Sequence, residues 1–454
     1  MTSFTAQASI LADVARCCHC EGKLEARGNA FVCLVCHSSF ENLGPIPALL
    51  GDREGLLRKS RQALADFEVM MQRAGLELQA QLGRFDLLPS TRQRIAHIAS
   101  ANRANRAAIT TLFASLAVTA DPIALERAER QGGGGAHVAQ YFEQVLRDWG
   151  WGDSAQNHSS LERLLGVTGN ERRLGRTLVL GAGPGRLAYD LHRALAPELT
   201  VALDIDPFVL LVAHAVLFED GVSLVETPID PGTPEQAALV RQLRRQGEPP
   251  EGFALVFADA FEPPFAEASF DTVITPWFID VAAEDARDVI ALVSHLLRPG
   301  GRWLNDGPLL YQTPNFALRY SRQELFELLK LAGFRIDLHT LTEVPYLRSP
   351  DSAHARTESV LSFGAIKEPS AVAEDAAETP NWVLLPHLRV PSFPHSAPSG
   401  PPVLARVLSL VDGSRSIHEI AEAMEPELQA PPGMTLVDVV GALLLQSYRQ
   451  SLTG

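Results

Sequence analysis

The feature that most constrains the fold is a glycine-rich loop that follows an apolar run and opens a helical pattern. The loop reads Gly181-Ala182-Gly183-Pro184-Gly185-Arg186 and comes directly after the apolar residues 177–180. Glycines at these positions permit positive φ angles and let the backbone approach a ligand closely. A second apolar run, 200–203, ends at Asp204, where a carboxylate can accept both hydroxyls of a ribose. The sequence therefore predicts a sheet that binds a nucleoside-containing cofactor at this loop.

Strand-like and helical patterns alternate beyond the loop, with further apolar runs at residues 254–257, 272–274 and 302–305. This alternation is typical of a doubly wound, mostly parallel α/β sheet. A dinucleotide fingerprint needs a third glycine where Arg186 stands, so the loop favours S-adenosylmethionine. Asp259 follows the run 254–257, at the position where methyltransferases contact the adenine amino group. Asp206 rivals Asp204 as the ribose ligand, but it precedes Pro207 and is better interpreted as a helix cap.

All five cysteines lie between residues 17 and 36, and four of them form two C-x-x-C pairs, Cys17 with Cys20 and Cys33 with Cys36. Two tight turns at this spacing can present four thiolates to one tetrahedral zinc ion. Unligated thiols or one redox pair are the alternatives, and Cys18, His19 and His37 are spare ligands. Together with residues 40–50, the pairs resemble the zinc ribbon of the small activator subunit of tRNA and protein methyltransferases. The expected role is structural, because four cysteines leave no open coordination position.

Net charge and hydropathy exclude several classes of function. The chain has 39 basic and 54 acidic residues, a net charge of −15, and no long Lys/Arg run, so nucleic-acid binding is not expected. The sequence has no uninterrupted apolar stretch of about 18 residues, so a membrane span is not expected. The first residues lack the basic and apolar regions of a secretory signal. We therefore expect a cytoplasmic enzyme that acts on a small molecule or a peptide.

Several motifs, in this order, look like the carnosine N-methyltransferase family: Gln144-Val145-Leu146-Arg147-Asp148-Trp149, the glycine loop, Trp277-Phe278-Ile279-Asp280 and a 297–311 segment that ends Gly307-Pro308-Leu309-Leu310-Tyr311. The similarity runs from about residue 55 to 367. It implies an S-adenosylmethionine-dependent methyltransferase of the Rossmann-like class I fold that methylates an imidazole nitrogen of the histidyl dipeptide carnosine.

The resemblance also assigns residues. It implies that the cofactor is held by Gln144, Arg147, Gly181, Gly183, Gly185, Arg186, Asp204, Asp259 and Ala260. It implies that the substrate is lined by Trp277, Phe278, Tyr311, Gln312 and Tyr346, with Asp280 as the catalytic anchor of the imidazole. Three departures alter the pocket walls. Gln312 stands where the family often has histidine, Asp306 replaces an apolar residue, and the family's tyrosines are replaced around residues 355–357.

A carboxylate suits the position of Asp280 for a chemical reason. A neutral imidazole has one N–H and one lone pair, so an anion that accepts the N–H fixes the tautomer and directs the other nitrogen at the methyl group. The ring becomes cationic as the methyl transfers, and the same anion stabilises that charge. Asp280 could instead cap a helix expected at 281–297.

We expect five segments: a zinc ribbon (1–50), a helical cover (51–130), the methyltransferase domain (136–367), a linker (368–380) and a small winged-helix-like domain (381–454). Ser90 is expected to cap the second helix of the cover, and Gln131–Gly135 to form a flexible break. The proline-rich region holds a strand-like stretch at 382–385, and Ser416 to Glu419 is a capping box.

Residues 408–421 look like the small winged-helix module that binds leader peptides in peptide natural-product pathways. The alternative for this region is a plain helical packing domain. Three hypotheses follow for the whole chain. They are methylation of a small imidazole-containing substrate or histidine-containing peptide, leader-guided methylation of a ribosomal peptide, and a non-catalytic scaffold that binds the cofactor.

Overall fold

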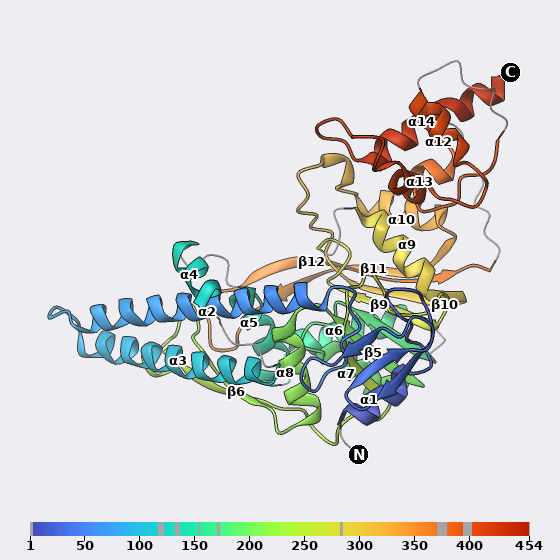
Figure 1. Ribbon diagram of the computed structural model, residues 1–454. Coiled ribbons are helices and arrows are strands. Elements are labelled where there is room, and N and C mark those ends of the chain that lie inside the picture. The colour runs from blue at the N-terminus through green and yellow to red at the C-terminus, as the bar shows by residue number, and fades with distance from the viewer. Residues whose placement is uncertain are drawn as a thin grey trace. The chain divides into compact units, whose positions relative to one another are not determined.

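The computed structural model describes residues 3–116, 122–131, 137–152, 155–169, 173–281, 285–369, 379–393 and 402–453. The chain divides into two units (Figure 1). Unit 1 comprises Met1–Phe278, Leu296–Pro308 and Asp337–Gly364, and unit 2 comprises Ile279–His295, Leu309–Ile336 and Ala365–Gly454. Residues 132–135 of the predicted break and 370–378 of the predicted linker lie outside the described ranges.

Seven strands form one mixed sheet in the order β11-β12-β10-β9-β4-β5-β8. Their bounds are β4 Arg176–Leu180, β5 Leu199–Asp204, β8 Phe253–Phe257, β9 Phe270–Pro276, β10 Leu297–Gly307, β11 Phe334–Tyr346 and β12 Arg356–Lys367. The five strands from β8 to β10 pair in parallel and contain every predicted apolar run. The order is typical of class I methyltransferases, which confirms the predicted α/β class. Since the chain moves outward from β4 in both directions, the carboxyl end of β4 borders the switch point where ligands bind.

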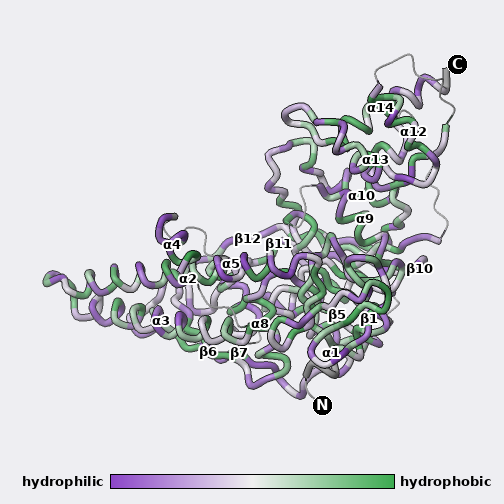
Figure 2. The backbone as a smooth tube through the Cα atoms, in the orientation of Figure 1, coloured by the Kyte–Doolittle hydropathy of each residue, from purple (hydrophilic) through white to green (hydrophobic). Residues whose placement is uncertain are grey.

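Helices alternate with these strands along the chain: α6 Ala155–Val167, α7 Arg186–Leu195, α8 Pro207–Phe218, α9 Ala286–Leu296 and α10 Arg322–Leu331. α8 is almost wholly apolar (Figure 2), and its residues are buried from Pro207 to Leu217. It contacts β8 and three elements from other parts of unit 1, which are β6 (Val222–Glu226), α3 (Pro89–Ala114) and α5 (His137–Val145), because a helix without a polar face must be covered on all sides. The strands β6 (Val222–Glu226) and β7 (Leu239–Leu243) form a separate antiparallel pair, with a 3₁₀ turn at Glu235–Ala237 between them.

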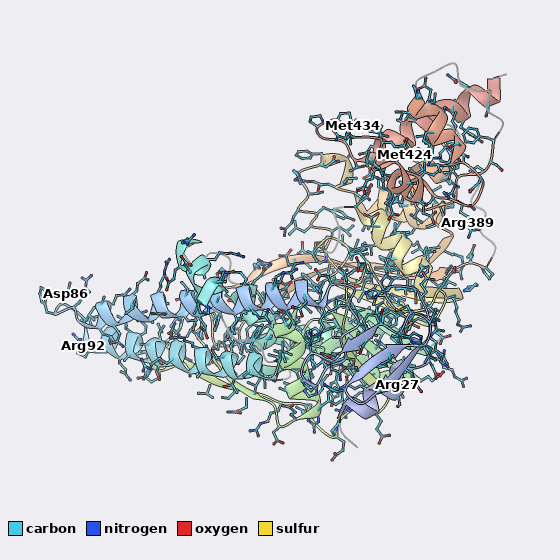
Figure 3. The ribbon with its side chains drawn as sticks, viewed as in Figure 1. Arg27, Asp86, Arg92, Arg389, Met424 and Met434 are labelled. Atoms are coloured by element: carbon cyan, nitrogen blue, oxygen red, sulfur yellow. The ribbon has the colours of Figure 1, made fainter. Side chains whose placement is uncertain are left out.

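The helical cover is an antiparallel pair, α2 (Arg53–Leu82) and α3 (Pro89–Ala114), with α4 (Pro122–Gln131) packed on α2. The prediction that Ser90 caps α3 is wrong. The helix begins one residue earlier at Pro89, whose fixed φ suits the first helical position, and Leu88 is the N-cap residue without a side-chain bond. Arg92 closes the turn instead, donating to the carbonyls of Leu82 and Arg84, and it lies with Asp86 at the tip of the pair (Figure 3).

The N-terminal segment consists of α1 (Ser3–Leu11) and a small antiparallel sheet, β1 (Leu24–Arg27), β2 (Ala30–Cys33) and β3 (Ser39–Glu41). It pairs with the edge of the large sheet. Phe257 of β8 donates its N–H to the carbonyl of Pro47, and its carbonyl accepts the N–H of Leu49, both at 2.9 Å. The segment therefore covers an edge strand that would otherwise present unpaired backbone groups.

Unit 2 contains α9 up to His295, a 3₁₀ turn at Phe316–Leu318, α10 and a C-terminal module, which we define as residues 379–393 and 402–453. The module's helices are α11 Asn381–Leu384, α12 Pro402–Ser409, α13 Ile417–Met424 and α14 Leu436–Thr453. The prediction of a strand-like stretch at 382–385 is wrong, because most of it forms α11, whose Trp382 packs into the module's core. The predicted capping box of Ser416 and Glu419 is confirmed at the start of α13. Within the described ranges, no helix combines the length and apolarity that a bilayer crossing needs.

Candidate functional site

The glycine loop has the backbone geometry that the sequence predicts. Gly181, Gly183 and Gly185 have φ angles of +62°, +55° and +80°, in the region that favours glycine. A Cβ at Gly181 would lie 2.6 Å from the ring of Phe278, whereas a Cβ at Gly183 would meet no atom of the described residues within 4 Å. Phe278 thus packs against the start of the loop, and the middle of the loop faces open space.

Asp204 ends β5 next to this loop. Its Oδ2 accepts the N–H of Gly183 at 2.7 Å and its Oδ1 accepts the N–H of Asp206 at 2.9 Å. Burial raises the pKa of Asp204 to about 6, with the charge of Asp206 acting in the same direction against these N–H bonds. Asp206 caps α8 by accepting the N–H of Val209 at 3.0 Å, which confirms that it is a helix cap.

Asp259 and Ala260 follow β8, the strand beside β5. Asp259 is half-buried, and its Oδ1 accepts the N–H of Phe261 at 2.9 Å, which shapes the turn after the strand. Ala260 is buried. The carboxylates of Asp204 and Asp259 therefore follow the carboxyl ends of adjacent parallel strands, where the two ends of an adenosine can be held.

Gln144 and Arg147 lie where α5 (His137–Val145) passes into a π-helical turn, Leu146–Gly150. Such turns occur frequently at functional sites because they redirect side chains within a helix. The Oε1 atom of Gln144 is buried and has no hydrogen-bond partner among the described residues. Buried amide oxygens are normally paired, so this atom fits a bound ligand. Arg147 donates to Asp148 Oδ1 at 2.7 Å; burial opposes the guanidinium charge, but Asp148 raises the pKa of Arg147 overall.

Two contacts tie the π turn to the glycine loop. The indole N–H of Trp149 donates to the carbonyl of Pro184 at 2.8 Å, and Arg186 Nη1 donates to the carbonyl of Asp148 at 2.9 Å. Arg186 also bonds Asp190 at 2.7 Å and lies 5.2 Å from the ring centre of Trp149. Sequence reasoning missed Trp149, although it lies in the motif that carries the resemblance. Arg186 is thus a link within the protein rather than a free cation.

Trp277 follows the end of β9 and has a φ of +51°, a strained conformation for a large side chain. Two neighbours hold Trp277 in this conformation. Its N–H donates to the carbonyl of Asp306 at 2.9 Å, and Gly307 leaves room for its backbone, since a Cβ at residue 307 would lie 2.9 Å from Trp277 Cα. The ring of Trp277 lies 4.6 Å from that of Tyr346, whose ring centre is 4.2 Å from the guanidinium of Arg356. Residues held in strained conformations cluster at functional sites.

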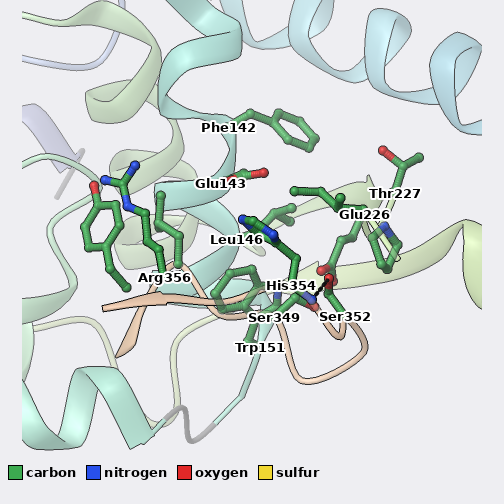
Figure 4. A pocket seen from close by; sticks show the side chains of 14 residues that line it. Phe142, Glu143, Leu146, Trp151, Glu226, Thr227, Ser349, Ser352, His354 and Arg356 are labelled. Carbon is green, nitrogen blue, oxygen red and sulfur yellow. Dashed lines mark hydrogen bonds between the residues drawn. The ribbon is translucent and has the colours of Figure 1, made fainter. Parts of the chain in front are cut away.

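A pocket of about 140 Å³ lies beside this stack in unit 1 (Figure 4). Its walls come from α5 and the π turn, from the end of β6 and from the segment between β11 and β12, and they include Phe142, Glu143, Leu146, Trp151, Glu226, Tyr346, Ser352, His354 and Arg356. The indole nitrogen of Trp151 is buried without a partner among the described residues. Sequence reasoning found only Tyr346 here and noted the change at 355–357. Phe142, Glu143 and Leu146 flank Gln144 along the helix, and that adjacency was the available signal.

The remaining predicted substrate residues lie in unit 2. Asp280 is 5% exposed, and its Oδ2 accepts the N–H of Leu310 at 2.8 Å. α9 is described from Ala286, so Asp280 precedes that helix by several residues, and the helix expected at 281–297 begins later. Tyr311 is 9% exposed, and its hydroxyl has no partner among the described residues. Burial, followed by the charge of Asp280, raises the pKa of Tyr311 well above its usual range. Gln312 is exposed.

Asp306 supports the sheet rather than lining a pocket. It is fully buried and forms a two-point pair with Arg163, at 2.8 Å for both bonds, while Ser362 donates to it at 2.7 Å. The interpretation of Asp306 as a changed pocket wall is therefore wrong. Its partner Arg163 lies on α6, 143 residues away in the sequence, so no local sequence pattern predicts the pair.

The four cysteines of the predicted zinc site come together. The Sγ atoms of Cys17, Cys20, Cys33 and Cys36 all lie within 4.8 Å of one another, with 3.6 Å between Cys17 and Cys36 and 3.5 Å between Cys20 and Cys33. Zn–S bonds of about 2.3 Å in a tetrahedron require sulfur separations of about 3.8 Å, so the cluster fits zinc. Cys18 is not part of this cluster, and His19 bonds Ser38 at 3.0 Å.

Residues 135–369, just over half of the 454-residue chain, match the family model described as carnosine N-methyltransferase. Among curated proteins, the chain is 26% identical over 194 residues to a carnosine N-methyltransferase of Dictyostelium discoideum, covering 37% of this chain and 41% of that protein. It is 28% identical over 223 residues to "Carnosine N-methyltransferase unmet" of Drosophila melanogaster, covering 44% and 46%. The chain thus spans less than half the length of these relatives.

Solved structures that resemble the chain include a phosphoethanolamine N-methyltransferase of Haemonchus contortus in complex with S-adenosyl-L-methionine, with 16% identity and a TM-score of 0.33 over 54% of this chain and 59% of that one. The N-methyltransferase NodS of Bradyrhizobium japonicum gives 13% identity and a TM-score of 0.30 over 47% and 95%. Structural similarities with TM-scores this low support no argument. The fold assignment rests on the strand order, and the family assignment rests on the sequence match. With its glycine loop, its paired aspartates and the match over half its length, the chain belongs to the carnosine N-methyltransferase family of S-adenosylmethionine-dependent methyltransferases.

Proposed function

We propose that this protein transfers a methyl group from S-adenosylmethionine to an imidazole nitrogen of a histidine-containing small molecule or peptide. The observation that carries the proposal is the buried carboxylate of Asp280, which follows the aromatic pair Trp277-Phe278 by two residues. A carboxylate that is 5% exposed is costly unless it is bonded, and the Leu310 N–H gives it one bond. An imidazole N–H is a donor of the kind that such an anion accepts.

In the proposed reaction, S-adenosylmethionine supplies the electrophilic methyl group when bound. Asp280 accepts the imidazole N–H, so the lone pair of the other ring nitrogen is free to attack. As that nitrogen gained the methyl group, the methyl–sulfur bond would break, with the thioether S-adenosylhomocysteine as the leaving group. The ring would be cationic until its N–H proton is lost to solvent, and the fixed anion stabilises that charge without having to reorganise. Tyr311, whose buried hydroxyl is unpartnered among the described residues, adds a donor in the same unit.

Binding of the cofactor is proposed for Gln144, Arg147, the glycine loop, Asp204, Asp259 and Ala260. The open space at Gly183 and the unpartnered oxygen of Gln144 support it. The walls of the pocket beside Tyr346, which lies in unit 1, differ from the family's around residues 355–357. Carnosine itself is therefore one candidate among histidyl compounds. We also propose that Cys17, Cys20, Cys33 and Cys36 hold one structural zinc ion.

The test is mass spectrometry of carnosine, histidine and a short histidyl peptide after incubation with S-adenosylmethionine. A gain of about 14 daltons, one methylene, on at least one compound is expected for the wild type. The gain should disappear in Asp280→Asn while cofactor affinity stays unchanged, because an amide can accept the N–H but cannot balance the cation. Asp86→Asn, at the tip of the α2–α3 pair, is the control. No gain on any imidazole with cofactor binding intact would contradict the proposal.

The relatives give the leader-guided alternative no support, so it is not part of this proposal.

A further inference from the structure

The C-terminal module shares a structural unit with the two segments that carry the proposed substrate anchors. Unit 2 combines Ile279–His295, which holds Asp280, and Leu309–Ile336, which holds Tyr311, with the chain from Ala365 onward. The contacts inside this unit give the module a role that the family resemblance does not supply.

A series of contacts leads from Tyr311 to an ion pair. The ring of Tyr311 meets the ring of Tyr320 edge to face, with centres 6.1 Å apart. The hydroxyl of Tyr320 donates to Asp285 Oδ1 at 3.1 Å. The N–H of Leu310 bonds Asp280, the proposed imidazole anchor, so residues 310 and 311 are restrained both by Asp280 and by the Tyr320 ring. The orientation of Tyr311 therefore depends on where Asp285 holds Tyr320.

Arg287 fixes Asp285 and reaches the module. Its backbone N–H donates to Asp285 Oδ1 at 2.9 Å, its Nε donates to Oδ2 at 2.7 Å, and its Nη2 lies 2.5 Å from the same oxygen. The remaining arm, Nη1, donates to the carbonyl of Leu384 in α11 at 3.2 Å. The side chains are largely buried, 23% exposed for Arg287 and 15% for Asp285, so solvent screens the pair less than it would at the surface.

A second contact joins the C-terminal module to the start of α9. His418 of α13 lies 3.9 Å from Asp288, one residue beyond Arg287. His387 is half-buried and close enough to Arg287, Asp285 and His418 for their charges to affect it. Burial, followed by the charges of His418 and Arg287, lowers the pKa of His387 to about 4. His387 is therefore neutral at neutral pH. The contacts that join residues 285–288 to the module include the bond from Arg287 to the Leu384 carbonyl and the approach of His418 to Asp288.

Building on the proposed imidazole chemistry, we propose that Arg287 is a positioning residue that ties the two segments holding Asp280 and Tyr311 to the C-terminal module. Through this link the module sets the affinity for the imidazole substrate. Arg287 does not touch the substrate. It acts through Asp285 and Tyr320 on Tyr311. Its loss removes the cation that fixes the Asp285 carboxylate, so Asp285 holds the Tyr320 hydroxyl less firmly and the range of orientations open to Tyr311 widens.

The test compares Arg287→Gln with Arg335→Gln in the full chain. Arg335 makes an exposed pair with Glu368 in the same unit, so the control removes the same chemical group from a site without the series of contacts. We expect Arg287→Gln to raise KM for the methylated imidazole about tenfold, as expected for one charge-assisted bond, with kcat changed by less than about twofold. The dissociation constant of S-adenosylmethionine should not change, because the proposed cofactor residues lie in unit 1. Arg335→Gln should match the wild type.

Hydrogen exchange of a peptide covering residues 309–320 is the second readout, and it needs no turnover. We expect faster exchange in Arg287→Gln than in the control. Wild-type KM and exchange in Arg287→Gln would overturn the inference, and so would an equal loss of cofactor affinity, which indicates general destabilisation. If the wild type methylates no imidazole, the proposed function fails while the exchange result still decides whether Arg287 holds the segment. If Arg287→Gln does not fold, Tyr320→Phe removes only the bond to Asp285 and should give the same changes at smaller size.

Discussion

The Asp204 carboxylate accepts the backbone N–H of Gly183 at 2.7 Å, which joins the centre of the glycine loop to the end of the neighbouring strand. The same carboxylate accepts the N–H of Asp206, the residue that caps the following helix. The Asp204 side chain thus fixes the turns that follow β4 and β5, the two strands whose ends border the proposed cofactor site. The arrangement explains why burial raises the pKa of Asp204 only to about 6, since these backbone N–H groups favour the charged form.

We predict that the affinity for S-adenosylmethionine falls as the pH is lowered through about 6. Protonation of Asp204 removes acceptor capacity that the ribose hydroxyls would use, and its pKa of about 6 places the change there. The group's contribution to folding stability runs the other way. Its folded pKa lies above the usual aspartate pKa of 3.8, so that contribution is full below about pH 4 and is lost as the pH rises through 6. Calorimetric titration at several pH values should show the decline, and Asp204→Asn should abolish it.

We predict opposite effects of Gln144→Leu on stability and on cofactor binding. The buried Gln144 oxygen has no partner among the described residues, so its removal should raise the melting temperature of the ligand-free protein. If the cofactor satisfies that oxygen, the same change should weaken binding about tenfold, the equivalent of about 1.4 kcal/mol. Gln242→Leu, at a side chain that bonds Ser223, is the control. A variant that is more stable and binds the cofactor normally would show that Gln144 does not contact it.

Local sequence predicted those parts of the site that one stretch of chain can specify. The glycine loop, the cap at Asp206 and the cysteine cluster depend on spacing within a few residues, and the structure has all three. The pair of Arg163 and Asp306 could not be predicted this way, because it joins residues 143 positions apart through the stacking of α6 on β10. The π turn at Leu146–Gly150 was equally hidden, since its residues read as an ordinary helix.

The errors have physical causes as well. Residues 382–385 are all apolar, as in a buried strand, but Trp382 is anchored in the core of the C-terminal module, and that packing favours a helix. Ser90 is a good cap in isolation, yet Pro89 is better suited to the first helical position, so the helix starts before the serine can cap it. In both cases a neighbouring constraint outweighed the local preference.

We predict about one zinc ion per chain, lost in Cys33→Ser and retained in Cys18→Ser. Cys33 lies in the four-sulfur cluster and Cys18 does not, so the two variants remove the same group inside and outside the site. Metal binding and folding of such segments are coupled, and the loss should expose residues 14–49 to hydrogen exchange. The exposure should extend to Phe257, whose N–H and carbonyl pair with Pro47 and Leu49. Elemental analysis measures the metal, and freshly purified wild type without metal would refute the site.

We predict that Asp306→Asn lowers the free energy of unfolding of unit 1 by about 3–5 kcal/mol, as expected when one partner of a buried ion pair is removed. The change leaves the Arg163 guanidinium 8% exposed without its carboxylate, and it weakens the bond from Ser362. Glu368→Gln is the matched control, since its pair with Arg335 is about half exposed and should contribute about 0–1 kcal/mol. Urea denaturation followed by tryptophan fluorescence gives the comparison, because Trp303 lies on the same strand as Asp306. Replacing both partners, Arg163→Met with Asp306→Leu, should restore most of the loss, because two apolar side chains leave no buried charge uncompensated. If the double variant is as unstable as Asp306→Asn, the pair holds the sheet through its geometry rather than through its charge.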